Sequence, residues 1–338
     1  MSAPSPRRTR RAVVGLLTLA LAAGSTAVTL PAAAAGLSGG YGLRAQYVAL
    51  GDSYASGEGL APYEEGTDTT DNRCHRSVDD SYPEQLEGGS TRAFDRATSR
   101  ACSGAITSSV LAELPGSDVG PQVGFLTPRT RTVTLTIGGN DAGFAQVLGN
   151  CVYSPVTDPQ VQALIPGRPG CRARLDALVS ARIANLAQPT GLPAFAPSVS
   201  IPQVLAGVTG RAPRATVYVS TYPQLLGNTY PSPYGCQVGS LGPIPLAITA
   251  DDGRWIREKG NQLNAAIAAS VAQARARGRD VRLVGVDRVF DGHNLCDSGT
   301  PWLNPVTVDA AGIAPSTFHP TVRGQQGFAD AMEQAAAR

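Results

Sequence analysis

The chain has 338 residues, of which 42% are hydrophobic and 16% charged, and its formal net charge is +2 at neutral pH. That length allows one large or two small domains. Lys259 is the only lysine, and the abundance of alanine, glycine and proline beside arginine indicates a bias in genome composition rather than a phosphate-binding surface. We therefore expect no nucleic-acid partner.

Residues 1–35 have the pattern of a secretory signal peptide. Four arginines precede an uncharged run over residues 12–23, and small residues follow up to Ala35, near which we place the cleavage site. Removing these arginines, with no acidic residue to offset them, changes the formal charge from +2 to −2. The paired arginines are compatible with Sec or twin-arginine export. The run is too short to cross a membrane, as is every later stretch, so we expect a secreted protein without a transmembrane segment.

Six cysteines follow the signal peptide, and an even number in an exported chain indicates disulfides. They allow 15 pairings, of which we predict the sequential set. A metal site is the alternative, but neither Cys-x-x-Cys nor His-x-x-x-His spacing occurs, and we expect no metal. The predicted pairs are Cys74–Cys102, Cys151–Cys171 and Cys236–Cys296.

The first predicted strand ends at a serine. Residues 47–50 are a short apolar run typical of a buried strand, and Gly51 and Asp52 interrupt it before Ser53. A strand that stops at a turn into a helix places this hydroxyl at the carboxyl edge of a parallel sheet, where α/β folds carry their active sites. On this stretch alone, a turn in which Ser53 is a helix N-cap is the favoured interpretation, and only the downstream motifs reverse it.

Strands and helices alternate along the rest of the chain. Residues 36–45 are expected to be a flexible lead-in to a single domain over residues 46–338. Within that domain, we interpret residues 149–213 as an elaborated excursion between sheet strands, not as a second domain. This alternation predicts a parallel sheet with helices on both faces. The predicted strands span residues 93–98, 132–137, 215–220 and 281–286. The predicted helices span 81–86, 106–114, 172–187, 251–277 (stopped by Gly278) and about a dozen residues from Val322, and residues 221–250 are mostly loop.

Four blocks of sequence resemble, in order, the motifs of the SGNH hydrolases, also called the GDSL esterase/lipase family. The most specific pieces are residues 137–144, Ile-Gly-Gly-Asn-Asp-Ala-Gly-Phe, and residues 318–320, Phe-His-Pro. The match covers roughly residues 45–335 and lies in the secreted actinobacterial branch of esterases, lipases and phospholipases. The blocks are Gly51-Asp52-Ser53-Tyr54, Gly104, Gly138-Gly139-Asn140-Asp141 and His319.

The resemblance implies a three-layer α/β/α sandwich with a flavodoxin-like parallel sheet of about five strands. It also implies Ser53 as the nucleophile and His319 as the base, a pair that suits acyl transfer because imidazole takes up a proton near neutral pH. The oxyanion hole is then the N–H of Ser53, the N–H of Gly104 and the side-chain amide of Asn140. Asp52 is expected to brace the turn around the serine.

Alternatives exist for each of these roles. Asn140 is also a common turn residue, and His75 and His293 compete with His319 as the base. His75 follows a cysteine in a loop, and His293 lies three residues before Cys296, where we expect a structural role. His319 precedes the last helix, which is where the family keeps its base. Asp141, like Asp52, is expected to be structural.

One position departs from the family pattern. The family usually has an aspartate three residues before the histidine, and Ser316 stands there instead. We therefore predict a Ser53–His319 dyad in which the backbone carbonyl of Ser316 or Thr317 orients the imidazole ring.

The expected function is hydrolysis of a carboxylic ester through a serine acyl-enzyme, without metal or organic cofactor. The expected partner is an acyl-ester substrate (a small ester, a triacylglycerol or a phospholipid), and the protein is expected to be a monomer. A glycan O-deacetylase with the same machinery is the second hypothesis. A non-catalytic surface-binding protein is the third, and it requires that the nucleophile, the base or the oxyanion donors be missing.

Overall fold

A parallel five-stranded sheet forms the centre of the computed structural model, which describes residues 47–338 except 88, 113–120, 189–198, 231–233 and 310–311. The strand order is β2-β1-β3-β4-β7, and every neighbouring pair is parallel. This is the predicted flavodoxin-like order. The strands are β1 (Tyr47–Gly51), β2 (Ala97–Ser99), β3 (Thr132–Thr136), β4 (Thr216–Ser220) and β7 (Val281–Val284).

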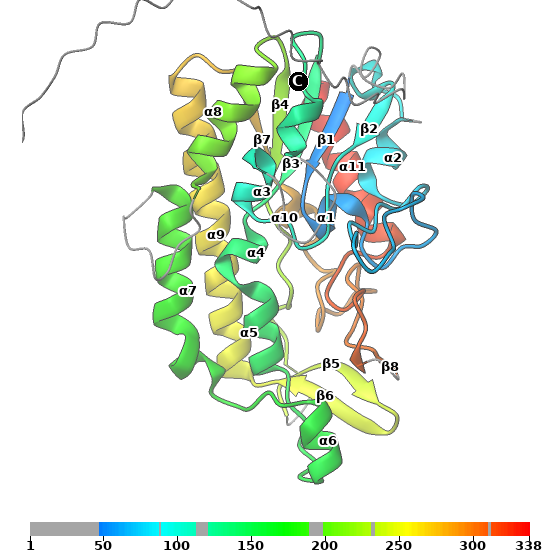
Figure 1. The fold of residues 1–338 in the computed structure, drawn as a ribbon. Helices are drawn as coiled ribbons and strands as arrows, with labels where there is room; N and C mark the ends of the chain where they lie inside the picture. Colours follow the sequence, from blue (N-terminus) through cyan, green and yellow to red (C-terminus); the bar gives the residue numbers. More distant parts are fainter. Residues whose placement is uncertain (1–46, 88, 113–120, 189–198, 231–233, 310–311) are drawn as a thin grey trace, which may run out of the picture. The chain divides into compact units, whose positions relative to one another are not determined.

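Two layers of helices cover the sheet (Figure 1). One layer holds α3, α7, α8 and α9, and the other holds α2 and α11; α9 and α11 both pack against β7. Because both faces are covered, β1 and β3 are buried along their whole length. The helices are α2 (Tyr82–Glu87), α3 (Thr107–Leu111), α7 (Cys171–Ala187), α8 (Ile201–Arg211), α9 (Ala250–Ala276) and α11 (Val322–Ala336).

Short elements complete the described chain, and most of them lie in the connections that join one strand of the sheet to the next along the chain. The described residues of the excursion over 149–213 form the end of α5 and the helices α6, α7 and α8, between β3 and β4. The remaining elements are α1 (Ser53–Ser56), α4 (Gly139–Ala142), α5 (Phe144–Cys151), α6 (Pro159–Leu164), α10 (Val286–Val289), β5 (Cys236–Leu241), β6 (Ile244–Ile248), β8 (Val308–Asp309) and β9 (Gly312–Ile313), with 3-10 turns at Arg92–Phe94 and Gln122–Phe125.

Some predicted elements differ from the structure. The strand placed at residues 93–98 begins only at Ala97, because a 3-10 turn occupies Arg92–Phe94. The segment predicted as mostly loop contains the antiparallel hairpin β5–β6. Pro245 lies inside β6, and a proline in a strand weakens the sequence signal for it. The predicted signal peptide and the lead-in over 36–45 lie outside the described residues, as does part of the helix expected at 106–114.

The three disulfides join the pairs predicted from the sequence, Cys74–Cys102, Cys151–Cys171 and Cys236–Cys296. Within residues 47–338, outside the gaps given above, no cysteine is free, and no cluster of three histidine, cysteine or acidic side chains is placed to hold a metal. In the same part of the chain, no helix is both long and apolar enough to span a bilayer.

Candidate active site

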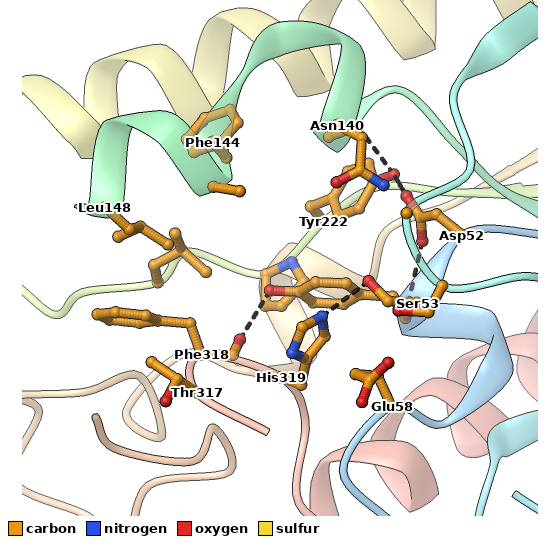
Figure 2. A pocket seen from close by; sticks show the side chains of 18 of the residues that line it. Asp52, Ser53, Glu58, Asn140, Phe144, Leu148, Tyr222, Thr317, Phe318 and His319 are labelled. Atoms are coloured by element: carbon orange, nitrogen blue, oxygen red, sulfur yellow. Dashed lines mark hydrogen bonds between the residues drawn. The ribbon is translucent and has the colours of Figure 1, made fainter. Parts of the chain in front are cut away.

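Ser53 and His319 meet at the carboxyl edge of the sheet, although they lie near opposite ends of the described chain. Ser53 is the first residue of α1, directly after β1, and His319 lies in the loop that precedes α11. The Nε2 atom of His319 is 2.7 Å from Ser53 Oγ (Figure 2). The structure therefore brings together the two residues that the sequence singled out from distant motifs.

Glycine at position 51 is required by the sharp turn before the serine. Gly51 has a φ of 138°, and a Cβ there would lie 2.3 Å from the carbonyl oxygen of Thr136 on the neighbouring strand. The side chain of Gln122 receives a hydrogen bond from the Gly51 N–H at 2.8 Å and donates one to its carbonyl at 2.9 Å. Asp52 caps α1 by accepting a hydrogen bond from the Tyr54 N–H at 3.0 Å. These contacts fix the backbone that presents Ser53.

Tyr222, which sequence reasoning missed, connects this turn to the end of β3. Its hydroxyl donates a hydrogen bond to Asp52 and lies 3.1 Å from the Gly139 backbone nitrogen, whose hydrogen it accepts. Burial raises the pKa of Asp52 to about 7, and the hydrogen bond from Tyr222 opposes that rise. Tyr222 comes just after β4, and a polar residue after a parallel strand is the signal that could have revealed it.

Two donors predicted for an oxyanion hole line the same cavity as Ser53. Asn140 donates one amide hydrogen to the carbonyl of Ala105 at 2.9 Å, which orients the amide and leaves its second hydrogen for another acceptor. Gly104 has a φ of 78°, a conformation that suits glycine, with no atom within 4 Å of where a Cβ would stand. Asp141 braces this region, because its carboxylate accepts the Thr107 hydroxyl at 2.7 Å.

The carbonyl that orients His319 belongs to Pro315, not to Ser316 or Thr317 as predicted. His319 Nδ1 is 2.7 Å from the Pro315 oxygen, whereas the Ser316 carbonyl accepts the backbone N–H of His319 at 2.9 Å. The tight turn at residues 315–319 brings the Pro315 carbonyl within hydrogen-bond distance of His319 Nδ1. Since a carbonyl can only accept, Nδ1 carries the ring hydrogen and Nε2 is free to accept one from Ser53.

The pKa of His319 is lowered from its ordinary value, mainly because the ring is buried. The negative charge of Glu58 and the backbone of Pro315 and Thr317 act in the opposite direction. The result is an imidazole that is neutral at neutral pH and can accept a proton. A general base must be in this state before the reaction begins.

The other two candidate histidines do not reach Ser53. His75 Nδ1 lies 2.9 and 2.8 Å from the two carboxylate oxygens of Glu58. His293 stacks on Trp302 with 4.1 Å between ring centroids, and its Nδ1 is 2.9 Å from the Thr300 carbonyl oxygen. The position of His293 agrees with the structural role expected from the sequence.

A cavity of about 330 Å³ opens beside the Ser53–His319 pair. Figure 2 shows Phe144, Leu148 and Phe318 on one side of the pair and Glu58 on the other. Much of the cavity lining is apolar and comes from the start of α5, from α9 and from the loops after β4 and before α11; we call this lining the apolar channel. Its apolar lining residues are Phe144, Leu148, Leu225, Ile256, Leu263 and Phe318.

A serine hydroxyl bonded to a neutral imidazole at the carboxyl edge of a flavodoxin-like sheet defines an α/β hydrolytic enzyme. The model of the GDSL-like Lipase/Acylhydrolase family matches residues 49–326, and the chain belongs to this family. It is a carboxylic-ester hydrolase.

The relatives and solved structures most similar to the chain include several from Streptomyces. The chain is 33% identical to a lipase of Streptomyces rimosus, covering 97% of this chain and 98% of that protein, and 30% identical to Lipase 1 of Streptomyces coelicolor, covering 93% and 94%. The crystal structure of the extracellular lipase of Streptomyces rimosus superposes with a TM-score of 0.60 at 29% identity, covering 86% of this chain and 100% of that one. Phospholipase A1 of Streptomyces albidoflavus NA297 gives 0.59 at 29% identity, covering 86% and 98%.

Proposed function

We propose that the protein is a secreted lipase or esterase that cleaves acyl esters through an acyl-enzyme on Ser53. The observation that carries this proposal is the 2.7 Å contact between His319 Nε2 and Ser53 Oγ, while Nδ1 donates a hydrogen bond to the Pro315 carbonyl. His319 takes the serine proton as the hydroxyl oxygen attacks the ester carbonyl carbon. The negative charge that develops on the carbonyl oxygen meets the N–H groups of Ser53 and Gly104 and the free amide hydrogen of Asn140.

The acyl-enzyme forms and is hydrolysed with the same proton carrier. When the tetrahedral intermediate collapses, His319 returns the proton to the departing alcohol oxygen, and the acyl group stays on Ser53. A water molecule then gives its proton to His319 and attacks the acyl carbon. When this second tetrahedral intermediate collapses, the bond between Ser53 Oγ and the acyl carbon breaks, and His319 returns the proton to Ser53 Oγ. The carboxylic acid leaves, and the free enzyme is restored.

The apolar channel favours a fatty acyl chain over the acetyl groups of a glycan. Phe144, Leu148 and Leu263 line it, and burial of each methylene of an acyl chain against such surface contributes about 0.8 kcal/mol. The names lipase and phospholipase A1 among the relatives support the same substrate class. Secretion is supported by the three disulfides and by similarity to an extracellular lipase.

A labelling experiment joined to a hydrolysis panel tests the proposal. A fluorophosphonate probe is expected to label the wild type and not Ser53→Ala. Ser56→Ala, in the same short helix, is the matched control and is expected to be labelled. The panel of p-nitrophenyl acetate, octanoate and palmitate, trioctanoin, phosphatidylcholine and acetyl-xylan is expected to show hydrolysis of the longer acyl esters. Labelling of a folded Ser53→Ala variant, or hydrolysis of acetyl-xylan alone, contradicts the proposal.

A further inference from the structure

Glu58 is a buried carboxylate at the edge of the active-site cavity. It follows α1, lines the same cavity as Ser53 and His319, and is only 3% exposed. Its backbone N–H donates a hydrogen bond to the Ser53 carbonyl at 3.1 Å, which ties its position to the serine turn. Figure 2 shows its carboxylate beside the His319 imidazole. A buried carboxylate costs free energy unless partners compensate it, so its place at this site needs an explanation.

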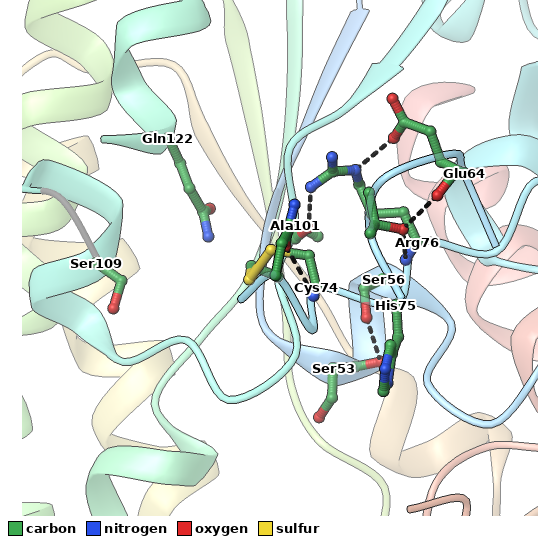
Figure 3. Close-up of a disulfide and its surroundings, with 12 residues drawn as sticks. Ser53, Ser56, Glu64, Cys74, His75, Arg76, Ala101, Ser109 and Gln122 are labelled. Atoms are coloured by element: carbon green, nitrogen blue, oxygen red, sulfur yellow. Dashed lines mark hydrogen bonds and ion pairs between the residues drawn. A yellow bond between two sulfur atoms is a disulfide. The ribbon is translucent and has the colours of Figure 1, made fainter. Parts of the chain in front are cut away.

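The far side of the carboxylate is held by His75. The Nδ1 atom of His75 lies within hydrogen-bond distance of both Glu58 oxygens. The His75 ring stacks on Tyr63, with 4.8 Å between ring centroids. The preceding residue, Cys74, is fixed by its disulfide to Cys102, next to His75 in Figure 3. These contacts hold the Glu58 carboxylate at the cavity edge.

The segment that carries Glu58 packs directly on the segment that carries His319. Gly59 has a φ of 86°, and a Cβ added to it would lie 2.5 Å from the Cβ of Ser316. Only glycine allows this approach. Ser316 stands where the family usually places its aspartate, so Glu58 is brought against the loop from which that carboxylate is missing.

We propose that Glu58 is the electrostatic partner of His319 and supplies, through space, the negative charge that an aspartate supplies in a catalytic triad. The proposal rests on the proposed roles of Ser53 and His319. The work of a triad acid is then divided, because the Pro315 carbonyl orients the ring while Glu58 stabilises the imidazolium that forms after proton transfer. No proton moves to Glu58, and no bond to it forms or breaks. Glu58 is a positioning residue that acts through His319.

Few other ionisable groups face the two residues. The Tyr54 ring lies 5.4 Å from the His319 ring, and burial raises the pKa of its hydroxyl, so it stays neutral. Asp52 lines the cavity but is bonded to Tyr222 and Tyr54. Glu58 itself faces His75 and Tyr63, and Asp68 Oδ1 lies 3.2 Å from the outer nitrogen of His75. Among the described residues, Glu58 is the charged side chain that raises the pKa of His319, against the effect of burial.

Replacement by glutamine separates charge from shape. Glu58→Gln retains an oxygen that accepts from His75 and removes only the negative charge. We expect kcat for p-nitrophenyl octanoate to fall about tenfold with little change in KM, because one unit of imidazolium pKa corresponds to about tenfold in rate. The acid limb of the kcat/KM profile is expected to move about one unit to lower pH, since loss of the negative charge disfavours the imidazolium. If Glu58 had only a structural role, its replacement would not shift the acid limb of the kcat/KM profile.

Two further variants complete the test. Glu64→Gln is the matched control, because Glu64 lies in the same loop, pairs with Arg76 (Figure 3) and does not line the cavity. We expect this variant to have the wild-type kcat and an unchanged acid limb of the kcat/KM profile. Glu58→Asp keeps the charge and is expected to retain most of the rate. An unmoved limb in folded Glu58→Gln, or equal losses in the glutamine and aspartate variants, overturns the role of Glu58. Ser53→Ala and His319→Ala remain inactive in that case, so the proposed function survives independently.

Discussion

The hydroxyl of Tyr222 donates a hydrogen bond to the carboxylate of Asp52, although the two residues follow different strands of the sheet. Because the same hydroxyl accepts the N–H of Gly139, one side chain links the turns after β1, β3 and β4. The nucleophile turn and the Asn140 turn are thereby held at a fixed separation. The position of the Asn140 turn relative to Ser53 therefore depends on Tyr222 as well as on the strands.

Asp52 is expected to make stability depend on pH. Its folded pKa of about 7 lies above the ordinary 3.8, so the stability associated with its protonated form is present at low pH and lost as pH rises through about 7. Asp52→Asn keeps a side chain that can cap α1, but it cannot ionise, so the variant does not lose stability in this way as the pH rises. The melting temperature of the variant relative to wild type should therefore increase between pH 5 and pH 8. Asp158→Asn, an exposed N-cap of α6, is the control and should show no such trend. A constant difference at both pH values contradicts the prediction.

Asn140 is expected to act on the transition state. The hydrogen bond to Ala105 leaves one amide hydrogen for the oxyanion, so Asn140→Ala should lower kcat about a hundredfold or more with little change in KM. Steady-state kinetics with p-nitrophenyl octanoate measure both constants. Asn150→Ala, which removes an exposed amide on α5, should leave both near wild type. An increase in KM alone would make Asn140 a substrate-binding residue.

The side chain at position 316 is expected to matter little. The ring of His319 is bound by the Pro315 carbonyl, which Ser316→Ala leaves in place. Activity should stay within about tenfold of wild type, whereas loss of a true triad acid costs about ten-thousandfold. His319→Ala should be nearly inactive while remaining folded. If Ser316→Ala is folded and inactive, its hydroxyl carries the orienting role, and the dyad assignment fails.

The apolar channel should set the preferred acyl length. Gly260 lines it from α9, and a Cβ there would meet only the flexible end of the Gln224 side chain, at 2.9 Å. Gly260→Val should therefore fold and reduce hydrolysis of p-nitrophenyl palmitate about tenfold more than that of the acetate. Ala265→Val places the same side chain on the exposed face of α9 and should leave the ratio unchanged. An unaltered ratio in Gly260→Val excludes this channel as the acyl site.

The disulfide Cys74–Cys102 should contribute to activity as well as to stability. The Ser103 N–H also donates to the Cys74 carbonyl at 3.1 Å, so the bridge secures the turn that presents Gly104. Replacing both cysteines by serine should lower the free energy of unfolding by about 2 to 5 kcal/mol and reduce kcat. Removing Cys236–Cys296, which anchors the β5 hairpin, should reduce stability with less effect on kcat. Equal kcat in the two variants contradicts this assignment.

Much of the fold could be predicted because its signals are local. The β-branched run at 132–136 forms a buried strand, and Gly278 follows the end of α9 with the positive φ expected of a stop residue. The hairpin β5–β6 was missed because its strands pair with each other outside the central sheet and include a proline. Strand pairing between short irregular segments depends on tertiary packing, which a local pattern does not report.

The site was predictable where side chains carry the chemistry. Ser53, Asn140 and His319 stand in distinctive motifs, and the structure brings them to one cavity. The Pro315 carbonyl could not be found, because every residue has a carbonyl and only the fold selects one. Glu58 gave no signal for a related reason. Its importance comes from the approach of Gly59 to a loop near the other end of the described chain.

The order of Ser53 and His319 along the chain has a consequence for biosynthesis. The ribosome makes Ser53 early, but His319 follows only with the loop before α11, almost at the end of the described chain. Until that loop packs against α1, a nascent polypeptide holds Ser53 without the imidazole of His319 beside it. Under the function proposed above, an incomplete chain is therefore inactive, and activity appears only once the loop before α11 has packed against the serine turn.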